Sequence, residues 1–220
     1  MSYGALLTDG SGVPFYIADT MPLTLLEKRT INSGSGLIDL FTGDGTPRYV
    51  FVNSNGAQGG SLSTCEALEI SGNVWRLRYA GATRQINVFI FGYQFQPIPS
   101  WGIQINDAQG RCILTNETKV LRDVQNLGDS TVDTSSGYKF STTLSGQWAV
   151  APVYTGYFSG TINQGGQPMP VVAQFASSSR FNGTTSQIAS GYIGNYEGAS
   201  ANGTFLNYRN RLTAINVERY

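Results

Sequence analysis

A ten-residue phrase near the start of the chain recurs near its middle, and this repeat limits how the chain can fold. Residues 3–12 and residues 101–110 both read aromatic-Gly, then a short alternating apolar stretch, then a polar turn closed by Gly. The identical residues, each 98 positions apart, are Gly4 and Gly102, Asp9 and Asp107, and Gly12 and Gly110. Because a strand and its turn are what is repeated, the phrase predicts two related β modules.

The composition fits a β protein with a neutral polar surface. Charged residues make up 13% of the 220 residues, well under the usual quarter or so, while 12% aromatic residues supply material for a core. The net charge is zero, without the basic excess of a nucleic-acid binder, so we expect no nucleic-acid partner. Little charge repulsion between copies suits a subunit of an assembly.

One strand marks the expected module boundary. Residues 86–95 alternate with a period of two, which predicts one face that is aromatic throughout and a second face buried only in its first half. Pro97 and Pro99 then end the strand, because proline cannot donate to a sheet ladder. We therefore expect an N-terminal β module at residues 1–98 and a C-terminal β module at residues 99–220.

Short runs of β-forming residues between turn dipeptides indicate further strands. They are expected at residues 49–52, 75–79, 103–106, 112–115, 138–143, 147–150, 171–176, 204–208 and 212–219. The expected turns are Asp9-Gly10, Asn55-Gly56, Gly165-Gly166, Asn182-Gly183 and Asn202-Gly203. Residues 22–28 fit one helical turn or a strand equally well. The prediction is an all-β chain of two β-sandwich-like modules in tandem, with little or no helix.

The segment 177–203 consists mainly of Ser, Gly, Asn, Thr and Ala, with Phe181, Tyr192 and Tyr196 interspersed. Isolated aromatic residues among small polar ones are typical of a recognition surface, so these three residues are candidates for host contact. The alternative, which the composition favours, is a long loop whose aromatic side chains pack back onto the sheets.

The residue types argue against catalysis, so we expect no catalytic residue. The chain has no histidine, which removes the nucleophile systems and general-base mechanisms that depend on one. A glycosidase would need two carboxylates across a cleft, and Glu66 with Glu69, or Glu197, are available. No pattern singles them out, and we expect Glu66 and Glu69 on the exposed side of a connecting segment.

No metal or cofactor site is expected either. Residues 9–12 and 42–45 have the composition of turns and one carboxylate each, whereas a calcium site needs more oxygen ligands. No glycine-rich stretch continues into the Gly-Lys-Ser/Thr of a phosphate-binding loop. Cys65 and Cys112 are interpreted as reduced, largely buried thiols.

The start of the chain lacks the pattern of a secretory signal, and no apolar run approaches the ~20 residues of a membrane span. We therefore expect folding in a cytosol. For that reason the glycosylation patterns at Asn116, Asn182 and Asn202 are interpreted as ordinary turns.

Around the repeated phrase the chain resembles a family of tail proteins of tailed bacteriophages. Those proteins commonly begin with an aromatic-Gly-aliphatic strand, a Gly-containing turn, and a strand leading to a short Asp-containing turn, as residues 3–20 do. The phrase often recurs midway after an aromatic strand and a proline-containing linker, as residues 89–107 do. The second copy departs from the first at residues 111–114 and at residues 116–118.

The resemblance implies a structural subunit of a virion tail, at its tip or its fibre attachment, without enzymatic activity. Its implied partners are other tail proteins and copies of itself, with a trimer as the first expectation, and the implied location is the virion after assembly in the host cytoplasm. The main rival is a carbohydrate-binding or receptor-binding module, with Trp101, Trp148 or Tyr192 as a stacking platform. Weaker rivals are a glycan hydrolase, a capsid-decoration protein and a bacterial adhesin.

Overall fold

The computed structural model of the protein describes residues 21–33, 36–55, 64–81, 84–128, 140–197, 204–207 and 211–220. These residues form strands and turns and no helix, which confirms the predicted all-β class. The strands are β1 (Thr24–Ser33), β2 (Gly36–Thr42), β3 (Arg48–Asn55), β4 (Thr64–Ser71), β5 (Val74–Gly81), β6 (Arg84–Gly92), β7 (Gln104–Asn106), β8 (Cys112–Thr115), β9 (Val124–Gly128), β10 (Ser141–Ser145), β11 (Trp148–Val150), β12 (Tyr154–Gln164), β13 (Gln167–Phe181), β14 (Thr185–Glu197), β15 (Thr204–Asn207) and β16 (Arg211–Asn216).

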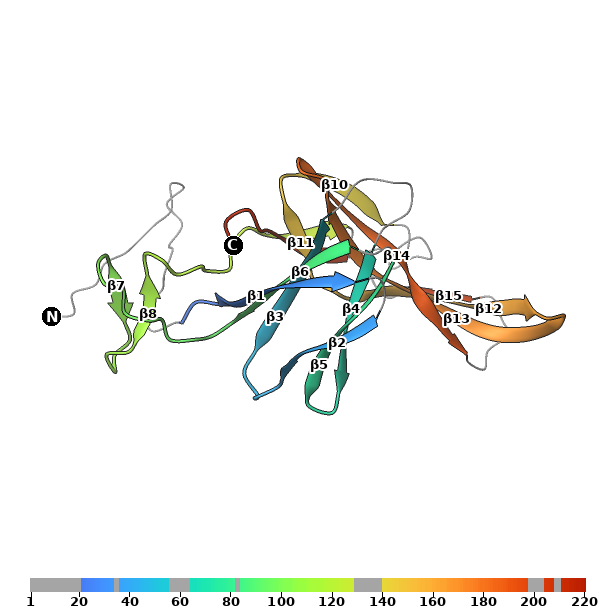
Figure 1. The fold of residues 1–220 in the computed structure, drawn as a ribbon, viewed down its shortest axis with the longest axis horizontal. Helices are drawn as coiled ribbons and strands as arrows, with labels where there is room; N and C mark the ends of the chain where they lie inside the picture. Colours follow the sequence, from blue (N-terminus) through green and yellow to red (C-terminus); the bar gives the residue numbers. More distant parts are fainter. Residues whose placement is uncertain are drawn as a thin grey trace.

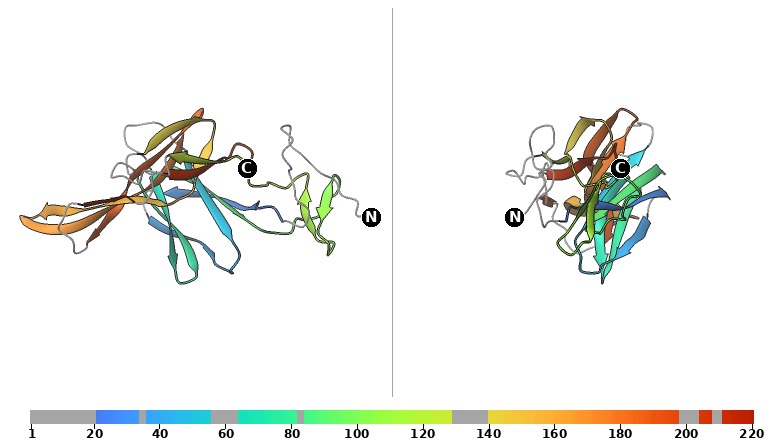
Figure 2. Two further views of the ribbon diagram at one scale, coloured as in Figure 1. Left: turned by 180° about the vertical axis from the view of Figure 1, so that it is seen from behind. Right: turned by 90° about the vertical axis from the view of Figure 1, so that its left-hand side faces the viewer.

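Fourteen of these strands join one large sheet, while β7 and β8 form a hairpin of their own. The main path of the large sheet runs β2-β5-β4-β13-β3-β11-β16-β9, with β6 and then β1 added beside β3 and the hairpin partners of β13 branching from it. In Figures 1 and 2 the β12–β13 hairpin extends from one end of this body, and the β7–β8 hairpin stands apart at the other end.

Strands from both sides of residue 98 pair with each other. Strand β3 pairs with β11 through Val52 and Val150, and β4 pairs with β13 through Glu66 and Ser177. The largest apolar cluster also draws on both parts, namely Ile31, Leu40, Val50, Val52, Leu77, Ile86, Val88, Ile90, Trp148, Val150, Ile188, Leu212 and Ala214. The tandem modules at residues 1–98 and 99–220 are therefore not confirmed, because the two parts share a sheet and a core.

Strand β6 lies between β1 and β3 and is buried on both faces. Its aliphatic face, with Val88 at its centre, joins the largest cluster, and its aromatic face, with Phe89 and Phe91, joins a second cluster. The predicted strand at residues 86–95 extended too far at its C-terminal end. The strand ends at Gly92, so the aromatic face is not buried throughout, and the side chain of Phe95 is 44% exposed.

The predicted loop at residues 177–203 was also wrong, because residues 177–181 continue β13 and residues 185–197 form β14. Its serines are buried rather than solvated, since they bond to backbone groups of strands brought in from elsewhere. Ser179 Oγ donates to the carbonyl of Trp148 at 2.6 Å, and Ser54 Oγ donates to the carbonyl of Ser179 at 3.0 Å. Small hydroxyl side chains thus allow close packing of strands here.

Most other strand predictions are confirmed within a few residues, including those at 49–52, 75–79, 103–106, 112–115 and 147–150. Residues 22–28 enter a strand, β1, rather than a helical turn. The turns at Gly165-Gly166 and Asn182-Gly183 connect β12 to β13 and β13 to β14. Strands β2, β4, β9 and β12 were not predicted. Residues 3–20, the first copy of the repeat, lie outside the described residues.

Candidate functional site

Of the three proposed host-contact residues, Phe181 and Tyr192 lie far apart and do not form one surface. Tyr192 is 53% exposed on β14, with its ring 6.2 Å from that of Phe175 in an edge-to-face arrangement. Phe181 is only half-exposed at the far end of β13, six residues from Phe175, or about 20 Å along an extended strand. Tyr196 belongs to β14, but its side chain lies outside the described part of the chain. Of the two side chains of this set that the structure describes, Tyr192 is the more exposed.

Two tryptophans named as stacking platforms have opposite environments. Trp148 is 7% exposed, and its indole Nε1 donates to the carbonyl of Ser145 at 2.8 Å, so it is a core residue and not a platform. Trp101 is 76% exposed beside the β7–β8 hairpin. Trp101 therefore remains available for contact with a ligand or a neighbouring protein.

Glu66 and Glu69, one pair of carboxylates considered for glycoside hydrolysis, do not face a common cleft. Glu66 and Glu69 are part of β4 and not of a connecting segment, and Glu66 is completely buried, so the predicted exposure was wrong. The register between β4 and β5 is regular, so residues three apart on β4 project from opposite faces. Glu66 and Glu69 are therefore not placed to act together on one glycosidic bond. The side chain of Glu197 is outside the described residues.

Glu69 belongs to a polar cluster that the sequence did not predict. The hydroxyl of Tyr154 donates to Glu69 Oε1, and Arg78 Nη1 lies 3.3 Å from Glu69 Oε1 and 3.3 Å from Gln174 Oε1. Burial and the bond to Glu69 raise the pKa of Tyr154. Burial acts to lower the pKa of Arg78, but the contacts with Tyr154 and Glu69 outweigh it and raise that pKa. Tyr154 and Arg78 thus keep their protons well above neutral pH.

A shallow pocket of about 360 Å³ opens next to this cluster. Its lining consists of Gly36, Leu37, Glu69, Arg78, Tyr79, Ala80 and Ile193. A β-bulge in β14 contributes to it, because Gln174 pairs with Gly194 and Phe175 pairs with Tyr192, which leaves Ile193 as the extra residue. The pocket combines a carboxylate, a guanidinium and an aromatic ring, which are groups suited to a neutral polar ligand.

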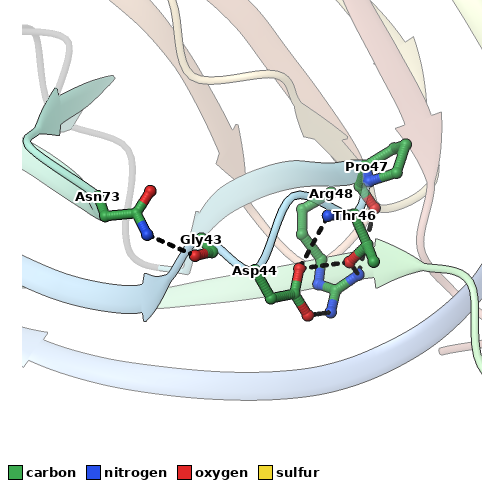
Figure 3. A network of polar contacts seen from close by, with 6 residues as sticks. All are labelled: Gly43, Asp44, Thr46, Pro47, Arg48 and Asn73. Atoms are coloured by element: carbon green, nitrogen blue, oxygen red, sulfur yellow. Dashed lines mark hydrogen bonds and ion pairs between the residues drawn. The ribbon is translucent and has the colours of Figure 1, made fainter.

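The carboxylate in the turn at residues 42–45 is engaged by its own loop (Figure 3). Asp44 Oδ1 accepts from the backbone N–H of Thr46 at 2.9 Å, and Asp44 Oδ2 lies 3.0 Å from Arg48 Nη2. The hydrogen bonds from Thr46, aided by the charge of Arg48, lower the pKa of Asp44. Asn73 Nδ2 donates to the carbonyl of Gly43 at 2.8 Å and ties the turn to the β4–β5 turn. This is a structural turn.

The β7–β8 hairpin shows what the repeated residues do. Asp107 Oδ1 accepts the backbone N–H groups of Gln109 at 3.0 Å and Arg111 at 2.8 Å, and Asp107 Oδ2 lies 2.7 Å from Arg111 Nε. Gly110 has a φ of 79°, and Gly102 has a φ of 119°, both of which favour glycine. The three residues that repeat at the 98-residue offset are thus the ones that the local backbone requires.

The hairpin region, residues 93–123, forms an arm with exposed apolar side chains. Ile98 is 73% exposed, Trp101 76% and Ile103 66%. Extended segments join the arm to the body, where the N–H of Leu25 donates to the carbonyl of Lys119 at 2.8 Å. Arginine 111 lies over the ring of Phe95, 4.2 Å from its centroid, and covers part of the arm. Half of the exposed large apolar side chains among the described residues lie in this arm.

A cleft of about 480 Å³ separates the arm from the final residues of the chain. Its lining is Ile103, Ile105, Leu114, Thr115, Asn116, Glu117, Thr118, Lys119, Val120, Arg122, Arg219 and Tyr220. The hydroxyl of Tyr220 donates to the carbonyl of Val120 at 2.7 Å and accepts the N–H of Arg122 at 3.1 Å, so the two sides of the cleft are in direct contact there. No local sequence pattern predicted this cleft, because its two sides come from residues about 100 positions apart.

Comparisons with protein-family models, with curated proteins and with solved structures found no match to this chain. Among the described residues, no helix is long and apolar enough to span a membrane, and no group of three or more acidic, cysteine or histidine residues is placed to hold a metal ion. Cys112 is a buried free thiol, and the side chain of Cys65 lies outside the described residues.

Proposed function

We propose that the chain is a structural subunit of a bacteriophage tail, at the tip or the fibre attachment, that assembles with copies of itself and with other tail proteins. The assembly role is supported mainly by the exposed apolar side chains of the arm. Ile98 and Trp101, three positions apart in the sequence, are both about three-quarters exposed. Large apolar side chains that cluster on a projecting element are typical of protein–protein contact surfaces.

The net charge supports the same role, because copies without net charge do not repel each other. The phage assignment itself depends on the resemblance of residues 3–20 and 89–107 to tail proteins. Tail-assembly genes on both sides of the coding sequence would support it, and genes of an unrelated system would contradict it.

The assembly role is tested by size-exclusion chromatography with light scattering over rising protein concentration. We expect a defined oligomer, with a trimer first, for the unaltered chain and dissociation for an Ile98→Ser, Trp101→Ser variant. Ile70→Ser is the matched control, because Ile70 is 59% exposed and belongs to β4, which is not part of the arm. An unaltered chain that stays monomeric at high concentration would contradict the proposal.

A glycan-binding role is the second candidate, favoured by the pocket beside Glu69 and Arg78. A neutral sugar would meet a fixed carboxylate–guanidinium pair there and the ring of Tyr79. Binding on a glycan array that is lost in Glu69→Gln and kept in Trp101→Ser would place the ligand in this pocket. Absence of saturable binding to any glycan would dismiss this candidate.

A further inference from the structure

The cleft at the base of the arm combines apolar and cationic side chains. Ile105, Leu114 and Val120 belong to the apolar part of its lining. Lys119 and Arg219 also line it, and within the described ranges neither of them forms an ion pair. A ligand that is complementary to this lining has an apolar face and carries negative charge.

Arg122 adds a third cation to the lining and is only weakly neutralised. Its ion pair with Asp123 spans 3.8 Å, and Asp123 does not line the cleft. Glu117 is the single acidic residue among the described residues that line the cleft, so the lining has a net positive charge. This charge selects against a basic ligand and favours an anionic one.

The backbone that carries these cations is held in place by hydrogen bonds to other parts of the chain. The carbonyl of Lys119 accepts the N–H of Leu25 at 2.8 Å, and the N–H of Arg122 donates to the hydroxyl of Tyr220 at 3.1 Å. Lys28 Nζ donates to the carbonyl oxygen of the same Tyr220 at 3.0 Å. The two sides of the cleft are thus positioned before a ligand arrives, which lowers the entropic cost of binding.

The size of the cleft and its polar groups indicate a small, hydroxylated ligand. A volume of about 480 Å³ lies in the range of small-molecule sites, whereas a protein partner needs a more extended contact surface. Asn116 and Glu117 line the cleft beside the hydroxyl-bearing Thr115 and Thr118. Amide and carboxylate groups form hydrogen bonds with sugar hydroxyls, and apolar side chains contact the C–H face of a sugar ring. The lining therefore favours an acidic sugar over an acidic peptide.

We propose that this cleft binds an acidic sugar of a glycan, with the acidic group on Lys119 and Arg219 and the hydroxyl groups on the neighbouring polar side chains. The acidic group is a carboxylate or a phosphate, because both form charge-assisted hydrogen bonds with lysine and arginine. The site is separate from the pocket beside Glu69, and it leaves Ile98 and Trp101, which do not line the cleft, for assembly. The proposal does not depend on the phage assignment.

The test measures the binding of oligosaccharide probes to the full chain by isothermal titration calorimetry. The probes are trigalacturonic acid, its trimethyl ester, and mannotriose with a terminal 6-phosphate. We expect saturable binding of an anionic probe, and binding of the ester that is weaker by about tenfold or more, because the ester keeps the rings and loses the charge. The tighter of the two anionic probes identifies the charge as that of a uronic acid or of a sugar phosphate. Equal binding of acid and ester, or no binding of either anionic probe, would overturn the proposal.

Paired charge variants locate the binding site. The Lys119→Gln, Arg219→Gln variant should weaken binding of the tighter anionic probe by about tenfold or more. The matched control is Arg76→Gln, Arg211→Gln, which removes the same two charges from β5 and β16, outside the cleft lining. It should keep the affinity within about twofold, because exposed charges that do not contact the ligand are screened by salt. A similar loss in both variants would show attraction by overall charge alone and would overturn the proposal.

Two further measurements separate this site from the other proposed roles. Glu69→Gln should leave the affinity for the anionic probe unchanged, and a loss in that variant would place the sugar in the other pocket and contradict the proposal. A hexaglutamate peptide should bind more weakly than the sugar probe, and tighter binding of the peptide would identify an acidic peptide as the ligand instead. A monomeric protein that binds the acidic sugar in the cleft contradicts the assembly role and leaves this site standing.

Discussion

Ser177 on β13 is predicted to be a major contributor to stability, although it is small and polar. Its side chain is completely buried, and its Oγ accepts the N–H of Val153 at 3.1 Å. The same oxygen lies 3.0 Å from the carbonyl of Ala151 and 3.2 Å from that of Glu66, and its single proton serves one of them at a time. The hydroxyl therefore joins strand β4 to the segment before β12 and to β13.

The change Ser177→Ala removes the acceptor of the Val153 N–H and the donor to the two carbonyls. A buried polar group left without a partner costs roughly 1–3 kcal/mol, so we expect a loss of about 2 kcal/mol in the free energy of unfolding. With a urea m-value of about 2–3 kcal/mol/M, the midpoint of unfolding should fall by roughly 0.7–1 M.

The assay is equilibrium unfolding in urea, followed by tryptophan fluorescence. The matched control is Ser145→Ala, because Ser145 is exposed in the same sheet, and it should change the free energy by no more than about 0.5 kcal/mol. If Ser177→Ala unfolds within that margin of the unaltered chain, the account of the buried serines is wrong.

Three further changes test the polar cluster and the arm. Tyr154→Phe should cost about 1 kcal/mol at pH 7 through the lost bond to Glu69. The pKa of Tyr154 is raised in the folded chain, so the unaltered chain loses stability as the pH rises above about 10. The difference in the free energy of unfolding between the unaltered chain and the variant, measured by urea titration, should therefore shrink above that pH. Asp107→Ala should abolish hydrogen-exchange protection of the Arg111 amide, whereas Arg111→Ala should keep protection at that position. Gly102→Ala should disorder the arm in amide NMR spectra while the body keeps its resonances, because φ is 119° there.

Local patterns in the sequence predicted most of the described strands and two of the turns between them. Residues 49–52 and 75–79 are short runs of β-forming residues, and Gly165-Gly166 and Asn182-Gly183 are turn dipeptides whose effect is local. Such signals depend on the nearest neighbours in the chain and are therefore readable without the fold.

The serine-rich part of β13 and β14 was not predictable in the same way. Ser178 and Ser179 resemble loop residues in composition, and only the arrival of other strands makes them buried. The carbonyl of Trp148, which accepts from Ser179, lies 31 positions away in the chain. The close approach of other strands favours small side chains at these serine positions. A single amino-acid sequence contains no signal that strands approach each other there.

The candidate site residues show the same difference between local features, which the sequence predicts, and long-range contacts, which it does not. Exposure of Tyr192 and Trp101 agrees with their predicted availability, whereas Trp148 is buried. The contact between Glu69 and Tyr154 joins residues 85 positions apart, so no spacing in the sequence indicates it. The structure does not show two separate cores divided at residue 98, because strands from both sides of that residue pair with each other. Such long-range pairing leaves no local signal in the sequence.

The shared core of the two parts is tested most directly by native-state hydrogen exchange in rising denaturant, which reports the free energy of opening for each strand. Amides of β6, before residue 98, and of β16, after it, should show the same opening free energy and the same dependence on denaturant. A β16 that opens at lower free energy and with a smaller dependence, while β6 stays protected, would contradict a single core and restore two separate modules.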